Sequence, residues 1–155
     1  MGSVFRWVRE LWLGRMALGQ TTNRATSAQT GVAYDLFTVA GGRIMVTQII
    51  GEITVAVVGA LTISLLATPT TGTARQLCTG LLTTGYAIGD LLGITGVNTD
   101  AMLPPASSAS IEGQTFGVMV SEGVISLAND IVDVGSIQWT LKWLPIDNGA
   151  AVVAA

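Results

Sequence analysis

The sequence contains no histidine and only one cysteine, Cys78. The absence of histidine excludes Ser-His-Asp and Cys-His catalysis, histidine-ligated metals and histidine proton relays. One cysteine adds nothing to a zinc site, which needs about four Cys, His or carboxylate ligands, or about three where the site is catalytic. No basic residue lies beside Cys78 to lower the pKa of its thiol, so we expect a packed, unreactive side chain.

Charged residues are also scarce, since Lys and Arg number 7, Asp and Glu number 10, and Lys142 is the single lysine. Solvent-facing helices are normally rich in Glu, Lys and Arg, so the chain has little material for a helical bundle. Nineteen Gly and nineteen Thr, together with many Val and Ile, instead favour short strands joined by tight turns. We therefore predict a mainly β fold, a small β-sandwich or barrel.

The sequence has no apolar run long enough for a membrane helix, although half of its residues are hydrophobic. The longest uncharged stretch is residues 53–74, and its apolar part, residues 53–67, has 15 residues. A spanning helix needs about 20. Hydrophobicity in this part alternates, which predicts two strands. At the N-terminus, Arg9, Glu10 and Arg15 interrupt any secretory signal.

The charges that are present divide the chain into two unequal parts. Residues 1–24 hold four Arg and one Glu, a net charge of +3, whereas residues 25–155 hold three basic and nine acidic residues, a net charge of −6. Such asymmetry is typical of an arm that contacts something other than its own domain. We predict an arm and linker over residues 1–31 and a β domain over residues 32–155, whose acidity disfavours nucleic-acid binding.

The arm has the pattern of a short amphipathic helix. Its apolar stripe is formed by Val4, Phe5, Trp7, Val8, Leu11, Trp12, Leu13 and Met16. A helix of this length is marginal alone, so we expect an anchor that folds onto a partner subunit or a lattice. Closure over its own core and insertion at a membrane surface are the alternatives. The residues predicted to contact a partner are Phe5, Arg6, Trp7, Arg9, Leu11, Trp12 and Arg15. Residues 19–31 lack an apolar period, which predicts a linker.

Turn residues divide the first half of the β domain. We predict a strand over residues 32–39, a turn at Gly41-Gly42, and over residues 43–58 either a strand pair or one long strand with a bulge at Gly51. Gly59-Ala60 separates two alternating runs, which is the pattern of a type II′ hairpin.

The second half begins with a region rich in turn residues. Residues 68–80 read as a loop, with a short helical turn within 74–82, and residues 85–96 as a loop with brief strands. We predict a second hairpin from residues 115–120 and 124–128 around Ser-Glu-Gly.

The final strand has the clearest pattern in the sequence. Ile137, Trp139, Leu141 and Trp143 alternate with polar residues, so this set is the predicted core strand. Pro145 ends the strand, and Asp147-Asn148-Gly149 turns the chain into an Ala/Val tail.

Motifs that carry chemistry are missing from the sequence. It has no phosphate-binding Gly-Lys-Ser/Thr loop, no dinucleotide fingerprint and no Gly-x-Ser-x-Gly elbow. Asp130 and Asp133 are the closest acidic pair, but they lack the density and spacing of a calcium loop, so we expect solvated loop carboxylates. We predict no catalytic, cofactor-binding or metal-binding residues and no cofactor.

Three blocks resemble virion proteins of tailed bacteriophages, namely residues 42–54 (GRIMVTQIIGEIT), 69–78 (PTTGTARQLC) and 137–150 (IQWTLKWLPIDNGA). The resemblance is to the capsid cement or decoration proteins. It implies a small β-barrel or jelly-roll-like fold, association as a homotrimer, and a position on the capsid surface bound to the major capsid protein. Residues 1–31 lie outside the resemblance.

The resemblance and the missing catalytic groups lead to the same expectation. We expect a non-enzymatic virion structural protein that binds the assembled capsid lattice and stabilises it, without contacts to nucleic acid or membrane. The alternatives are another virion component, such as a head-fibre base or a tail protein, and a membrane-active surface protein that uses the arm and residues 53–67.

Overall fold

The computed structural model describes residues 19–25 and 29–155, and every regular element within them is a strand. The predicted amphipathic helix and all its partner-contact residues lie outside these ranges. The thirteen strands are β1 (Gln20–Ala25), β2 (Gln29–Thr30), β3 (Tyr34–Ala40), β4 (Ile44–Val55), β5 (Thr62–Pro69), β6 (Arg75–Gln76), β7 (Leu81–Leu82), β8 (Leu91–Gly93), β9 (Val118–Val120), β10 (Gly123–Asn129), β11 (Val132–Asp133), β12 (Ser136–Pro145) and β13 (Ala151–Ala154).

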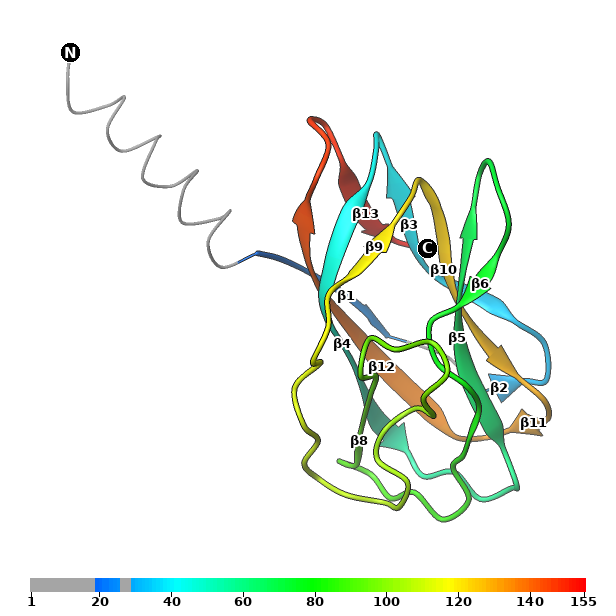
Figure 1. Cartoon of the computed structure of the whole chain (residues 1–155). Coiled ribbons are helices and arrows are strands. Elements are labelled where there is room, and N and C mark those ends of the chain that lie inside the picture. Colours follow the sequence, from blue (N-terminus) through cyan, green and yellow to red (C-terminus); the bar gives the residue numbers. More distant parts are fainter. Residues whose placement is uncertain (1–18, 26–28) are drawn as a thin grey trace.

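The strands form two antiparallel sheets that pack face to face (Figure 1). The first sheet has the order β1-β12-β4, with β8 and β9 both paired to β4. The second has the order β13-β3-β10-β5, with β6 and β7 both paired to β5, and β2 and β11 form a separate small pair. The mainly β prediction is confirmed, whereas the barrel alternative is wrong because the two sheets do not close into one.

Long strands that follow one another in the chain lie in different sheets. The corner at Gly59-Ala60 joins β4 in the first sheet to β5 in the second, and the corner at residues 121–122 joins β9 to β10 in the same way. Both predicted hairpins are therefore wrong. Alternating strands flanking a Gly-containing turn are common to a hairpin and to a corner between sheets, so the local pattern does not reveal which strand is the partner.

The pairing partners come instead from opposite halves of the chain. The strand β3 pairs with β13, β4 pairs with β12, and β5 pairs with β10. Residues 37–69 consequently run antiparallel to residues 123–154 through both sheets, like one ribbon wound into a sandwich. Closing such long loops is entropically costly, so the core that the ribbon encloses must supply the stability.

The strand β4 is one continuous strand, as one of our two predictions had it, but its bulges are not at Gly51. The register with β12 passes over Thr47 and over Thr54, which are left without a partner residue. The Thr47 hydroxyl donates to the Lys142 carbonyl (3.1 Å) and the Thr54 hydroxyl to the Ser136 carbonyl (3.1 Å). Each threonine thus satisfies a carbonyl at the irregularity it creates.

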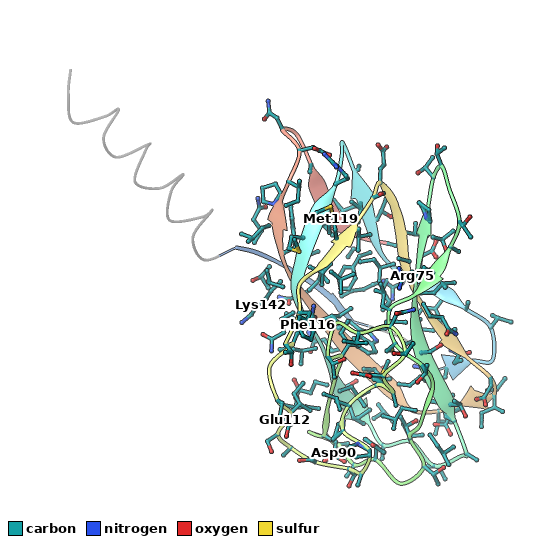
Figure 2. The ribbon with its side chains drawn as sticks, viewed as in Figure 1. Arg75, Asp90, Glu112, Phe116, Met119 and Lys142 are labelled. Carbon is teal, nitrogen blue, oxygen red and sulfur yellow. The ribbon has the colours of Figure 1, made fainter. Side chains whose placement is uncertain are left out.

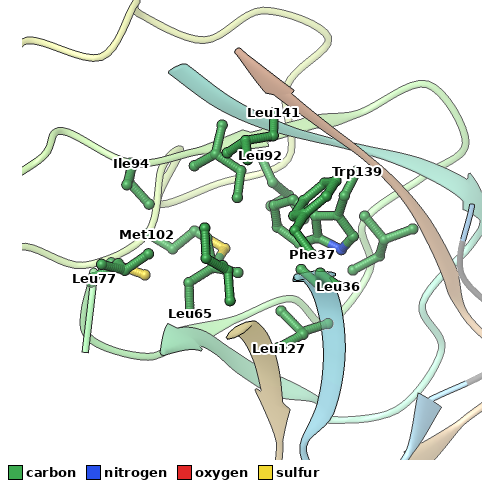
Figure 3. Close-up of a cluster of buried hydrophobic side chains, with 14 of the residues drawn as sticks. Leu36, Phe37, Leu65, Leu77, Leu92, Ile94, Met102, Leu127, Trp139 and Leu141 are labelled. Atoms are coloured by element: carbon green, nitrogen blue, oxygen red, sulfur yellow. The ribbon is translucent and has the colours of Figure 1, made fainter. Parts of the chain in front are cut away.

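The role of Gly51 is to make room for the indole of Trp139. The two residues are direct partners across β4 and β12, and a Cβ on Gly51 would lie 2.9 Å from ring carbons Cζ3 and Cη2. Trp139 is fully buried, and Ile137, Leu141 and Trp143 are buried on the same face of β12, as predicted. Figure 3 shows Trp139 beside Phe37 and Leu36 from the opposite sheet.

Two edge strands were not predicted from the sequence. The segment predicted as a linker contains β1, which pairs with β12, and the predicted tail contains β13, which pairs with β3. Hydrogen bonds hold them together: the Thr22 hydroxyl donates to the Val152 carbonyl (3.4 Å), and Arg24 Nε donates to the Ala155 carbonyl (2.8 Å). Because hydrogen bonds hold these edge strands, their sequences need not alternate between apolar and polar residues.

Of the other local predictions, some are confirmed and one is wrong. The turns at Gly41-Gly42 and at residues 147–149 are confirmed, as is the brief strand in residues 85–96. The helical turn within residues 74–82 is wrong, because β6 and β7 pair with β5 in extended form. Residues 53–67 supply the end of β4 and most of β5, so the two predicted strands are confirmed.

The contact between Gly51 and Trp139 gives the first testable prediction. Gly51→Ala should lower the free energy of unfolding by about 1–3 kcal/mol, because the new methyl group displaces a ring that the core holds on all sides. Gly113→Ala is the matched control, since a Cβ there meets no atom within 4 Å, and it should stay within about 0.5 kcal/mol of the parent. Urea unfolding measures both, and equal stabilities would contradict this account of Gly51.

Candidate functional site

The buried carboxylate of Asp133 braces the corner between β4 and β5. Asp133 is 7% exposed; its Oδ2 accepts the Gly59 N–H (2.6 Å) and its Oδ1 accepts the Gly135 N–H (2.6 Å). The neighbouring Asp130 is exposed and accepts the Thr62 N–H (2.7 Å). The prediction of solvated carboxylates therefore holds for Asp130 and is wrong for Asp133, which supplies the acceptors that the corner backbone lacks.

These hydrogen bonds control the ionisation of both aspartates. Burial by itself would raise the pKa of Asp133, but the N–H groups of Gly135, Gly59 and Val58 outweigh it and hold the pKa below its ordinary value. The N–H of Thr62 is the main cause of the lowered pKa of Asp130. Both groups are thus negatively charged at neutral pH.

An ion pair closes the opposite end of the sandwich. Asp147 Oδ1 lies 2.7 Å from Arg43 Nη2, and Asp147 Oδ2 accepts both Arg43 Nε–H and the Arg43 backbone N–H, each at 2.8 Å. The hydrogen bonds from Arg43 hold the pKa of Asp147 well below its usual range. This pair joins the turn between β3 and β4 to the turn between β12 and β13.

The remaining candidate groups are packed or engaged within the fold. Cys78 is buried as predicted, and burial raises the pKa of its thiol to about 11, so the nucleophilic thiolate is disfavoured. The Tyr86 hydroxyl donates to the Pro104 carbonyl (2.6 Å). Among residues 19–25 and 29–155, no three Cys, Asp or Glu side chains are placed to hold a metal ion. The same residues contain no helix able to cross a membrane.

A groove opens at one edge of the sandwich, between β6 of the second sheet and β9 of the first. Its volume is about 440 Å³. The lining residues come from β5, from β6 and the residue after it, from the segment 96–98, and from β9 and the residue before it: Ala67, Arg75, Gln76, Leu77, Gly96, Val97, Asn98, Gly117, Val118 and Met119. We call this feature the edge groove. The opposite edge of the sandwich, by contrast, is closed by the hydrogen bonds of β1 described above.

The edge groove has the chemistry of a protein-binding surface. Arg75 is exposed, with Nη2 donating to Asn98 Oδ1 (2.9 Å), while Met119 and, beside the groove, Phe116 are 54% and 57% exposed (Figure 2). Arginine, methionine and aromatic side chains are enriched where proteins bind one another. Moreover, β6 and β9 are each paired on one side only in the sheets described. An extended peptide could add to such a strand edge.

The structure does not join the sequence-predicted residues into one site. The core strand residues Ile137, Trp139, Leu141 and Trp143 are buried and shape the interior. The groove residues were missed, because two short strands distant in the chain supply its walls. Arg75, one of few basic residues in the β domain, was the one sequence feature that could have indicated the groove. Comparison with protein-family models, with curated proteins and with solved structures gives no match.

The carboxylates that brace the corners predict an acid-sensitive fold. A pKa lowered in the folded state gives stability that is fully present above the unfolded pKa, about 4, and is lost as the pH falls through the folded pKa. We therefore expect the free energy of unfolding to fall steeply below about pH 4. Asp133→Asn and Asp147→Asn should each flatten that dependence, measured by urea unfolding from pH 7 to pH 2.

Val153→Thr, at an exposed position that carries no titratable group, is the control and should keep the parent's loss of stability at low pH. If the free energy of unfolding falls as steeply at low pH in Asp133→Asn and Asp147→Asn as in the parent protein, these carboxylates do not brace the corners.

Proposed function

We propose that this chain is a non-enzymatic virion structural protein that binds the assembled capsid lattice of a tailed bacteriophage and stabilises it as a cement protein. It sits on the capsid surface as a trimer, with the N-terminal arm contacting neighbouring subunits. The edge groove is the observation that supports this function best, because it offers a protein-binding surface on a fold whose candidate reactive groups are buried or engaged.

The three blocks that resemble cement proteins fall on two different parts of the structure. Residues 42–54 and 137–150 include most of β4 and nearly all of β12, which pair with each other along their length. Residues 69–78 lead from β5 through β6 to the edge groove, and Thr70 to Gln76 are all exposed. Two blocks therefore shape the interior, whereas the third shapes a surface.

The winding of the strands supports the finer description of the fold. An antiparallel ribbon wound across two sheets is the principle of a jelly roll, and residues 37–69 with 123–154 form such a ribbon. We accordingly propose a jelly-roll-like fold, and the short amphipathic helix of the arm, which lies outside the described residues, stays a prediction from the sequence.

Stabilisation of the shell would follow from mass action. A protein that binds only the assembled lattice favours that state by RT ln(1 + [L]/Kd), where [L] is its free concentration and Kd its dissociation constant. In the edge groove, an extended segment of the major capsid protein would pair with β6 or β9, and Arg75 would pair with an acidic side chain of that segment. Three linked copies would multiply the affinity without new contacts.

Substitution of the exposed groove residues tests the docking site. In Phe116→Asp combined with Met119→Asp, charge replaces apolar contact, so the dissociation constant for cement-free heads should rise by about tenfold or more. Val153→Asp is the matched control, because Val153 is 58% exposed on β13, away from the groove. Occupancy is measured by sedimentation of heads with bound protein. Parental affinity in the double variant would rule out the edge groove as the capsid contact.

Location in the particle separates this function from the nearest alternative. A head-fibre base or a tail protein would be expected at unique vertices or on the tail, whereas a cement protein occupies repeated lattice positions. Electron cryo-microscopy of virions that carry labelled protein distinguishes these patterns. Labelling confined to the tail or to single vertices would contradict a cement function.

A further inference from the structure

Exposed aliphatic side chains gather at the end of the sandwich where β4 passes into β5. Six of the eleven large hydrophobic residues that are exposed in the described ranges belong to this end, with exposed fractions from 44% to 76%. They are Val55, Val58, Leu82, Ile88, Val132 and Val134, and we call them the apolar end. Single exposed aliphatic residues are ordinary, but a group of six marks a contact surface.

Backbone hydrogen bonds hold the segments of the apolar end together. The Val57 N–H donates to the Tyr86 carbonyl (3.1 Å), the Gly89 N–H donates to the Ile53 carbonyl (2.9 Å), and the Thr83 N–H donates to the Leu61 carbonyl (2.8 Å). The segment 130–135 is fixed to the same corner by Asp133 and Asp130. Hydrogen bonds therefore bring loops from three parts of the chain together at one end of the sandwich, the lower end in Figure 1.

The charges around this surface are all of one sign. Asp130 in its loops and Glu52 on β4 are exposed, whereas Asp90 and Asp133 are buried in the same loops. Of the basic residues in the described ranges, Arg43 lies at Asp147, Arg75 at the edge groove and Lys142 beside Gln48. Arg24 lies opposite Trp139 on β1, and its Nε donates to the Ala155 carbonyl. The exposed charges of the loops at the apolar end are thus negative, and they would favour an apolar occupant that carries positive charge.

The arm of this chain has that chemistry. Residues 1–18 combine Phe5, Trp7, Leu11 and Trp12 with three Arg and one Glu, a net charge of +2. Tryptophan and arginine are the side chains most often found as anchors in protein interfaces. An arm that pairs its apolar stripe with the exposed aliphatic residues would bring its arginines near the exposed carboxylates of Asp130 and Glu52.

The point where the arm leaves the body favours a second copy as the acceptor. Gln20 pairs with Trp143 near the Pro145 end of β12, whereas the apolar end lies at Ser136, seven residues away. Seven strand residues span about 23 Å. In the predicted helix, Leu11 at the centre of the apolar stripe would lie only about 14 Å from Gln20, because a helix rises about 1.5 Å per residue. The centre of the stripe would thus fall short of the apolar end of its own copy, which favours the apolar end of a neighbouring molecule.

We propose that residues 1–18 of one copy dock on the apolar end of a second copy of this chain. The contact is heterologous, because the donor and acceptor surfaces differ, and repetition around a rotation axis closes a ring. This inference deepens the proposed function because it names the contact that would hold the trimer together. It rests on the proposed function for one point only, which is that the ring contains three copies.

Two full-length variants test the donor and the acceptor separately. The acceptor variant carries Val58→Glu and Val134→Glu at the apolar end, and the donor variant carries Trp7→Glu and Leu11→Glu in the arm. Each should raise the dissociation constant of self-association at least a hundredfold, measured by analytical ultracentrifugation. Val153→Glu is the matched control and should associate like the parent. Circular dichroism and urea unfolding show whether each variant is folded.

Mixing the two variants distinguishes a heterologous contact from other kinds of association. The acceptor variant keeps an intact arm and the donor variant keeps an intact apolar end, so an equimolar mixture should form a one-to-one heterodimer that neither variant forms alone. Failure of the mixture to associate while both variants remain folded would overturn the inference. A parent chain that remains monomeric at all concentrations, or an acceptor variant that associates normally, would overturn it too.

Crosslinking gives a second measurement that does not depend on lost binding. Leu13→Cys in one full-length chain and Ala60→Cys in another should form a disulfide across the contact upon mild oxidation, whereas Leu13→Cys with Val153→Cys should not. The native Cys78 is buried and gives little background. Head occupancy by the groove variants is independent of both measurements, so a failed arm contact and a failed capsid contact can be told apart.

Discussion

The structure depends on one constraint, which is that the chain changes sheet at nearly every connection between long strands. Backbone groups at such a corner leave the hydrogen-bond ladder and need other partners. Carboxylates supply them: Asp133 accepts the Gly59 N–H in the corner after β4 and the Gly135 N–H just before β12. Asp147 with Arg43 ties together the two turns at the opposite end. A chain with few charges thus uses several of them at the corners, where the main chain cannot pair with itself.

This winding also decides which surfaces are free for binding. One edge of the sandwich is closed because β1 and β13 are linked through Thr22 and Arg24. The other edge ends in short strands, β6 and β9, that have no further partner within the described sheets, and the edge groove opens between them. The corners themselves expose aliphatic side chains at one end. The candidate binding surfaces therefore lie where strands have no further strand to pair with and where the chain turns from one sheet to the other.

Much of the fold could be predicted from local patterns, and the rest could not for a physical reason. The alternation of Trp139 and its neighbours identified a half-buried strand, and Gly and Asp residues located the turns. The partner of each strand is a long-range property that no local pattern carries, so both hairpins were wrong. The same limit hid the brace at Asp133 and the edge groove. Polar β1 was missed because hydrogen bonds, rather than burial, hold that edge.

The uneven charge of the sequence has a spatial counterpart in the fold. The positive charge and aromatic residues of the arm are joined to one end of the sandwich, and the acidic aliphatic surface lies at the other. The edge groove, with Arg75 as its charged residue, is separate from both. Self-association through the ends would leave the groove free, so a ring could present several grooves to a lattice at once. Each copy could then bind its neighbours and the shell without competition between the two contacts.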